Sequence, residues 1–249
     1  MHVVVIAKRV PDLVEDLVID SEGRALDPDE TEYKLNEFDD QALEQALLIK
    51  DAHGCKVSVL MHDADGVDKI LYTALAKGAD SAIKVCTDAE ELDGNFALAQ
   101  AMAAALGTLD YDLVLTGVQG ADDRDGQLGP LLASLLDVPC VNVASGVSAA
   151  DGAVTVHKEY SGGKMARFSM ALPGLLGIQA AAQSPRYVPV SKVRAVQKEA
   201  SLQELEVEGD FEPLSRVAAM SAPEQSAGAK MLGGAPELLA LLKEQGVVS

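Results

Sequence analysis

The sequence predicts an α/β protein with a doubly wound, mostly parallel sheet, an added antiparallel hairpin region and a C-terminal arm. Three observations lead to this fold class. Up to residue 136, short apolar runs alternate with segments of helical periodicity, the order typical of parallel sheets. After residue 139 the pattern changes to alternating strands joined by glycine turns, and after residue 183 few core-forming residues remain. The composition agrees, because 48% of the residues are hydrophobic while only 4% are aromatic.

The first half of the chain is predicted to hold four strands and four helices. Residues 3–7 form an almost wholly apolar run, as in a strand that is covered on both faces. The polar stretch 11–36 that follows has room for a small hairpin around Leu17–Ile19 and Gly23. Further apolar runs predict strands at 56–61, 81–86 and 113–117. Apolar residues at helical spacing predict helices from 36–39 to 52, and at 67–77, 95–106 and 126–136.

The second half is predicted to begin with an antiparallel region. Alternating strands are expected at 141–147, 153–160 and 164–170, with turns at 150–152 and 161–163, and residues 172–179 are expected to add a strand to the main sheet. The chain then divides into a domain of residues 1–183 and an arm of residues 184–249. The arm combines an extended segment at 184–189, an acidic run at 205–212, a linker at 220–229 and a leucine-rich helix at 236–245. Such an arm either folds back on its own domain or packs on a partner's surface.

Charge and composition exclude several classes of function. The formal net charge is −19, from 39 acidic and 20 basic residues, which opposes binding to nucleic acid or to anionic membranes. No uninterrupted apolar run approaches the roughly 18 residues of a membrane span. A basic pair follows the first strand at once, unlike the layout of a secretory signal peptide. Three scattered cysteines without metal-ligand spacing indicate a reducing compartment, so we expect a cytoplasmic protein.

A ligand site is predicted where the first and fourth strands end. If the sheet has the order 3-2-1-4-5, ligands bind in the crevice between those strands, which the loops 7–12 and 117–130 would border. The second loop contains four glycines and leads into a helix, whose free N–H groups favour an anion. We interpret this loop as a nucleotide phosphate site, against the alternative of an acidic turn that only caps a helix. Asn36 and Asp39 either hold a base or ribose or serve as a helix N-cap, and the cap is the simpler interpretation.

Motifs for bond-breaking chemistry are missing from the sequence. The four histidines lack paired-ligand spacing, so we expect no metal site. There is no nucleophile elbow, P-loop, GxGxxG or CxxC motif, and no poised acid–base pair. We therefore expect no catalytic side chain.

In order along the chain, several segments resemble the small (beta) subunit of electron transfer flavoproteins. The resemblance covers nearly the whole chain and is carried by segments 5–12, 36–46, 74–80, 112–119, 129–130, 172–173, 184–187 and 228–230 and by the terminal leucine-rich helix. It implies a domain of adenine-nucleotide-binding type and a heterodimer with the large (alpha) subunit, on which the arm packs. The large subunit would hold most of one FAD site, and this chain would hold either AMP or a second FAD.

The resemblance also implies which residues contact the nucleotide. Gly126, Gln127 and Leu128 would meet phosphate at the start of a helix. The full set of implied contacts is Ile6, Ala7, Lys8, Asn36, Phe38, Asp39, Met61, Gly117, Gln119, Asp122, Asp123, Arg124, Asp125, Gly126, Gln127 and Leu128.

Partner recognition is implied for Arg186, Tyr187 and Val190. Val190 stands where the family commonly has the Leu that anchors into an acyl-CoA dehydrogenase, and the Lys-rich run that usually follows is missing here. The implied function is an electron carrier rather than a stand-alone enzyme, moving electrons between flavin dehydrogenases and a downstream acceptor. Two alternatives stay open: a component of an NAD-linked electron-bifurcating flavoprotein, and a nucleotide-sensing domain of the universal-stress kind.

Overall fold

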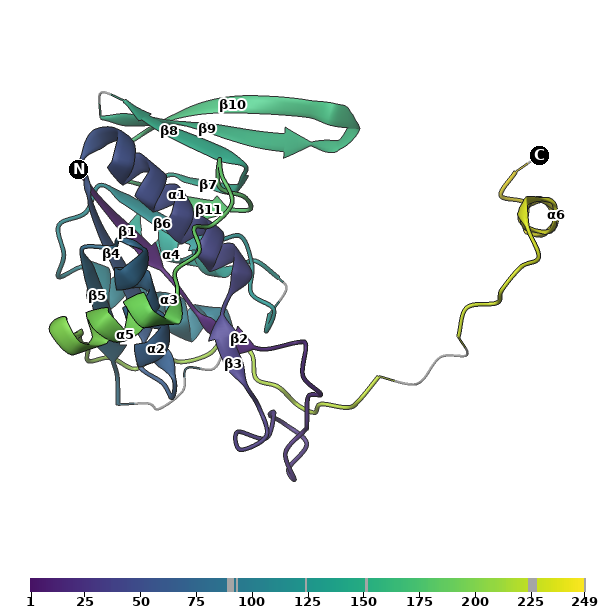
Figure 1. The fold of residues 1–249 in the computed structure, drawn as a ribbon, viewed down its shortest axis with the longest axis horizontal. Coiled ribbons are helices and arrows are strands. Elements are labelled where there is room, and N and C mark those ends of the chain that lie inside the picture. Colours follow the sequence, from purple (N-terminus) through teal and green to yellow (C-terminus); the bar gives the residue numbers. More distant parts are fainter. Residues whose placement is uncertain (89–91, 93, 124, 151, 224–227, 249) are drawn as a thin grey trace.

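A seven-stranded parallel sheet forms the centre of the protein (Figure 1). The computed structural model describes residues 1–249 except 89–91, 93, 124, 151, 224–227 and 249. In spatial order the strands are β12 (Gln203–Glu206), β5 (Ser81–Cys86), β4 (Lys56–His62), β1 (His2–Ile6), β6 (Leu113–Gly117), β11 (Gly174–Ile178) and β7 (Cys140–Ala144). Neighbouring strands all pair in parallel, as the βα alternation predicts. The doubly wound α/β fold is thereby confirmed.

Four helices cover the two faces of this sheet. They are α1 (Glu37–His53), α2 (Val67–Lys77), α3 (Gly94–Leu106) and α4 (Leu128–Leu136). Successive residues of a strand point to opposite faces, so Val3 and Val5 pack with α1 and α2, whereas Val4 and Ile6 pack with α3 and α4. Because both faces are covered, the strand needs apolar residues at every position. This requirement explains the unbroken apolar run at the start of the chain.

A separate antiparallel sheet of β8 (Gly146–Ala150), β9 (Ala153–Tyr160) and β10 (Lys164–Ala171) lies beside α1 (Figure 1). The prediction of one strand over 141–147 is wrong, because that segment is divided between β7 in the main sheet and β8 in the small sheet. The division falls next to Val143, whose φ of 65° is rare for a β-branched residue, and to a shift in the β7–β11 register. The turn between β8 and β9 includes Asp151, which lies outside the described residues.

The polar stretch after β1 holds a strand pair in addition to the expected hairpin. Its ends pair as β2 (Arg9–Pro11) and β3 (Tyr33–Leu35), which run antiparallel. Around Gly23 the expected small hairpin is present in a short form, as an antiparallel bridge of Ile19 with Leu26 flanked by two backbone hydrogen bonds.

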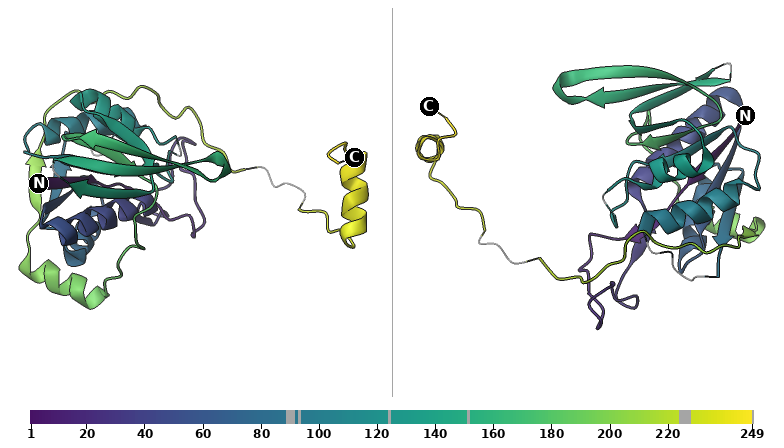
Figure 2. Two further views of the ribbon diagram at one scale, coloured as in Figure 1. Left: turned by 90° about the horizontal axis from the view of Figure 1, so that it is seen from above. Right: turned by 180° about the vertical axis from the view of Figure 1, so that it is seen from behind.

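The C-terminal arm is partly attached to the α/β domain. After the extended segment, α5 (Val190–Glu199) lies beside α2, and β12 adds an edge strand to the main sheet. The sequence analysis did not predict either element. Farther on, α6 (Ala235–Glu244) lies apart from the domain with no buried residue (Figure 2). In the part of the chain that the structure describes, no helix has the length and apolar character needed to cross a membrane.

Candidate functional site

The strands β1 and β6 are neighbours at the centre of the sheet, and the chain leaves them in opposite directions across it. Of the expected order 3-2-1-4-5, the first four positions are confirmed, whereas β11 lies between the fourth strand, β6, and the fifth, β7. The switch point of the sheet is therefore where β1 and β6 end, as expected. We call the space there the β1–β6 crevice. It is lined by Lys8, Asn36, Asp39, Gly117, Val118, Gln119, Gly120, Asp123, Gly126 and Leu128.

Asp39 joins the ends of both strands to the first turn of α1. Its carboxylate accepts hydrogen bonds from the N–H of Lys8 at 2.9 Å and from the N–H of Gly117 at 2.7 Å. The side chain is fully enclosed, and this burial raises the pKa of the carboxyl to about 6, although Lys8 and the two N–H donors act in the opposite direction. Asp39 thus fixes the spacing between the two loops that border the crevice.

Asn36 occupies the N-cap position of α1, yet its side chain makes no capping hydrogen bond. Instead, its Nδ2 donates to the carbonyl oxygen of Gln119 at 2.8 Å, across the crevice. The simpler interpretation of Asn36 and Asp39 as helix caps is therefore wrong for both side chains. Each of them ties α1 to the loop after β6.

Lys8 places a buried cation in the crevice. Its Nζ lies 2.9 Å from Asp122 Oδ1 and 2.8 Å from Asp123 Oδ2, and the side chain is only 9% exposed. Burial lowers the pKa of the amine, but the two carboxylates outweigh burial and raise it overall. Lys8 therefore stays protonated and draws the loop after β6 toward β1.

The loop from Gly117 to Leu128 passes very close to its neighbours. A Cβ on Gly117 would lie 2.4 Å from Asp39 Oδ1 and 2.8 Å from the Phe38 backbone. Gly126 has a φ of 65°, and a Cβ there would lie 2.6 Å from the Val118 carbonyl oxygen. The helix α4 begins directly afterwards at Leu128, two residues later than predicted. Glycine is thus required where the chain turns into this helix.

Two residues that the sequence analysis missed lie next to this loop. Thr116 Oγ1 and Asn142 Oδ1 are buried and have no hydrogen-bond partner in the structure. Thr116 is the last but one residue of β6, and its Oγ1 would lie 2.9 Å from a Cβ on Gly129. The Asn142 amide donates to the Gly126 carbonyl oxygen at 3.4 Å, and its Oδ1 faces Gly177 in β11. An unpartnered buried oxygen is costly, so such atoms mark a place where a ligand group can bind. Thr116 had a weak signal, as a hydroxyl in an otherwise apolar strand.

Other residues implied by the resemblance lie farther from the crevice. Ile6 and Met61 have side chains in the two hydrophobic cores, so only their backbone atoms can contribute to a site. Ala7 is buried and Phe38 is half-buried beside Gly117, whereas Asp125 and Gln127 are exposed. Arg124 lies outside the described residues.

The residues implied in partner recognition lie elsewhere, along α1 and at the start of α5. Glu44, which is 4% exposed, accepts hydrogen bonds from the backbone N–H, Nε and Nη2 of Arg186. The same guanidinium contacts Asp51 at 2.9 Å. Tyr187 and Val190, by contrast, are 85% and 62% exposed. The arginine anchors the segment, and the two neighbouring side chains face outward.

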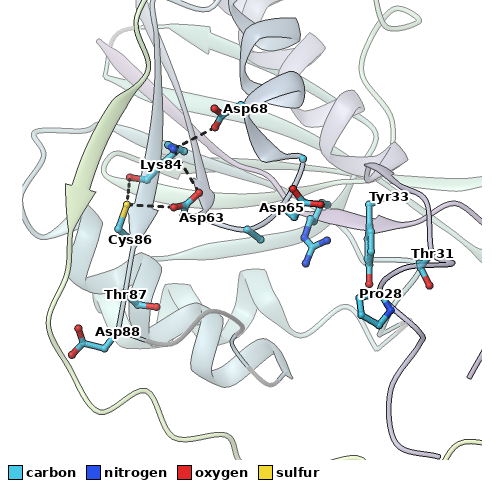
Figure 3. Close-up of a pocket in the computed structure, with 13 residues that line it drawn as sticks. Pro28, Thr31, Tyr33, Asp63, Asp65, Asp68, Lys84, Cys86, Thr87 and Asp88 are labelled. Atoms are coloured by element: carbon cyan, nitrogen blue, oxygen red, sulfur yellow. Dashed lines mark hydrogen bonds and ion pairs between the residues drawn. The ribbon is translucent and has the colours of Figure 1, made fainter. Parts of the chain in front are cut away.

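A larger cavity of about 770 Å³ lies beyond the ends of β4 and β5 (Figure 3). Lys84 points toward Asp63 and Asp68 in it, at 3.7 and 3.4 Å, and pairs with Glu204 at 3.2 Å. Arg9 stacks on the Tyr33 ring at 4.0 Å. The sequence analysis did not predict this cavity. Among the described residues no group of three or more His, Cys, Asp or Glu side chains is arranged to hold a metal ion.

The residues of the β1–β6 crevice fit the phosphate and sugar end of a nucleotide. Lys8 supplies a cation, the loop before α4 supplies N–H groups, and Thr116 offers a hydroxyl without a partner. The Lys8 ammonium and the loop N–H groups are donors of the kind that bind an anion, and among the described residues of the crevice no nucleophile lies beside a base. The arrangement can bind and orient a nucleotide.

The sheet order and the crevice define the chain as a doubly wound α/β protein with its candidate site at the switch point. A family model for the electron transfer flavoprotein domain matches residues 25–208. The chain is 29% identical over 261 residues to electron transfer flavoprotein subunit beta of Bacillus subtilis, covering 100% of both chains. It is 30% identical over 237 residues to the protein of that name from Methylophilus methylotrophus, covering 90% of both.

A third relative has a different name. The chain is 30% identical over 199 residues to acryloyl-CoA reductase electron transfer subunit gamma of Anaerotignum propionicum, covering 78% of this chain and 73% of that one. The chain belongs to the electron transfer flavoprotein family, as a beta subunit, and its function is in electron transfer.

Proposed function

We propose that this chain is the small subunit of a heterodimeric electron transfer flavoprotein that binds a nucleotide in the β1–β6 crevice. The observation that carries the proposal is the convergence of Lys8, Asn36, Asp39 and the loop 117–128 at the switch point of the sheet. These segments are distant in sequence and were expected together on a resemblance to this family. The family match over 25–208 favours this function over a nucleotide-sensing regulatory domain.

The large (alpha) subunit is the proposed partner, and it would hold most of one FAD. The flavin, when bound, supplies the electron acceptance and donation, and the protein supplies binding and orientation. The exposed helix α6, with leucines but no buried residue, is a surface that a large subunit could cover. We further propose that flavin dehydrogenases, such as acyl-CoA dehydrogenases, meet the complex at Tyr187 and Val190 and that a downstream acceptor takes the electrons. A cytoplasmic location is proposed on the cysteine pattern.

The nucleotide in this subunit is either AMP or a second FAD. The crevice alone offers contacts for one phosphate and one sugar, as AMP requires. The cavity of about 770 Å³ favours the larger ligand, FAD. Arg9 on the wall of this cavity is next in the chain to Lys8 in the crevice, so a larger ligand would contact both residues. A second FAD would also support the NAD-linked, electron-bifurcating alternative.

The test is the nucleotide content of the full chain co-purified with its large subunit, measured by chromatography after denaturation. One FAD with one AMP per heterodimer supports a simple electron shuttle. Two FAD without AMP per heterodimer supports a flavin in this subunit and the NAD-linked, electron-bifurcating alternative. A chain that purifies alone with ATP or AMP and no flavin would contradict the proposal.

A further inference from the structure

The Asp123 carboxylate lies at the centre of the loop between β6 and α4. Its Oδ1 accepts hydrogen bonds from the N–H groups of Gly120 at 3.4 Å, Asp125 at 3.1 Å and Gly126 at 3.4 Å. Its Oδ2 accepts a hydrogen bond from Lys8 Nζ at 2.8 Å. An anion of the chain itself is thus held by a cation and several converging N–H groups.

These donors are the ones that a nucleotide phosphate would need in the crevice. A protonated amine and converging backbone N–H groups of a turn are typical phosphate ligands. With Asp123 in place, the cavity between the two loops is about 10 Å³, which is room for about one water molecule. A phosphate group therefore enters the crevice only after the contacts between Lys8 and the loop have parted.

Asp122 adds to the same closure. Both of its carboxylate oxygens lie within 3.0 Å of Lys8 Nζ, so two carboxylates compete for one ammonium group. Asp122 differs from Asp123 in that its side chain is 40% exposed. Its hold on Lys8 is therefore weakened more by solvent.

We propose that Asp123 is an affinity-determining residue of the crevice: its carboxylate occupies the anion position, and a nucleotide phosphate displaces it from Lys8 and from the N–H groups of Gly120 and Gly126. This inference rests on the proposed function, because it assumes that a nucleotide binds here. The contacts of Asp123 stabilise the closed state, in which its carboxylate pairs with Lys8. The apparent binding affinity equals the affinity of the open state multiplied by the fraction of molecules that are open. Lys8 serves both states, paired with Asp123 in one and with phosphate in the other.

The experiment is a calorimetric titration of the full chain, freed of co-purified nucleotide, with AMP and in parallel with FAD. The variant Asp123→Asn keeps the size of the side chain and loses its charge. We expect its Kd for the ligand that the wild type binds to fall about tenfold, the effect of losing one charge-assisted contact in the closed state. Asp16→Asn is the control, because it removes the same charge at an exposed residue in the stretch between β2 and β3, outside the crevice and outside the residues expected to contact the nucleotide. It should change the Kd by less than about twofold.

Three results would overturn the inference. An equal effect of Asp123→Asn and Asp16→Asn would mean that only net charge matters, and weaker binding by Asp123→Asn would mean that the carboxylate shapes the bound state. If circular dichroism shows that Asp123→Asn does not fold, the same titration of Asp122→Asn tests the inference instead. Asp122→Asn should lower the Kd about threefold relative to Asp16→Asn, and no difference between these two variants would contradict the proposal. If the wild type binds neither ligand, the proposed function itself fails. That outcome is distinct from the results above, in which the wild type binds and only the role of Asp123 is contradicted.

Discussion

Replacing Glu44 with alanine should release the chain segment that leads into α5. Glu44 is the buried member of the pair with Arg186, and it accepts hydrogen bonds from the backbone N–H and the guanidinium of that residue. Two further contacts hold the same segment on α1, from the N–H groups of Ala181 and Ala182 to Gln41 and Gln45. Glu44 makes the buried charged contact with this segment, whereas Asp51, which also contacts Arg186, is exposed, so the removal of Glu44 should matter most.

The magnitude follows from the exposure of the two partners. A charge-assisted hydrogen bond contributes about 1.5–3 kcal/mol, and Glu44 makes several such contacts. The Arg186 side chain is 33% exposed, so its guanidinium regains water and keeps Asp51 as a partner. We therefore expect a net loss of about 2–3 kcal/mol for the segment, which is about a 30- to 150-fold increase in its local opening.

Amide hydrogen exchange measured by mass spectrometry reports this opening directly. Peptides that cover 181–189 should exchange faster in Glu44→Ala, while peptides from β4 in the core should not change. Asp51→Ala is the matched control, because Asp51 contacts the same guanidinium but is 61% exposed, and its removal should change exchange by about twofold. Equal effects of the two variants, or unchanged exchange in Glu44→Ala, would refute the assignment of Glu44 as the anchor.

Three other predictions follow from the site and the arm. Gly117→Ala should lower the melting temperature and weaken nucleotide binding, because the new Cβ would lie 2.4 Å from Asp39 Oδ1. The control in circular dichroism melts is Gly228→Ala, whose new Cβ would have no atom within 4 Å. Because burial raises the pKa of Asp39 to about 6, the folded state takes up a proton before the unfolded chain does, and the contribution of this group to stability rises as pH falls from 7 to 5. Urea unfolding should show a gain of about 1 kcal/mol over that range in the wild type relative to Asp39→Asn, and parallel pH profiles would contradict it. Val190→Asp should slow electron transfer from a partner dehydrogenase about tenfold without changing the melting temperature, because this exposed side chain contributes to docking rather than to the core. An unchanged rate of electron transfer would place the docking surface elsewhere.

The main sheet was largely predictable because its signals are local. The helix 67–77 and the strands 81–86 and 113–117 have the predicted bounds, since apolar periodicity and glycine stops define them without reference to the rest of the chain. The division at Val143 was not predictable, because its positive φ and the shifted register depend on contact with β11. The helix α5 had a signal in Val193 and Val196, which are spaced for one face and half-buried against α2.

The candidate site was predictable in position but not in its contacts. Strand order and loop composition place Lys8, Asn36 and Asp39 near the loop 117–128. Which carboxylate pairs with which donor depends on distances of a few tenths of an ångström, which no sequence pattern contains. For this reason Asn36 was interpreted as a cap, although its amide reaches Gln119. Thr116 and Asn142 were missed because an unpartnered oxygen is a property of the packed structure alone.

The attachment of α5 at both of its ends has a consequence for limited proteolysis. Before this helix the chain is fastened to α1 through Arg186, and after it β12 pairs in parallel with β5. A single protease cut within α5 would therefore leave two fragments that stay associated under native conditions and separate only in denaturant. A partner that binds this helix likewise contacts an element that is held at both ends, by the sheet and by α1, rather than a loose tail.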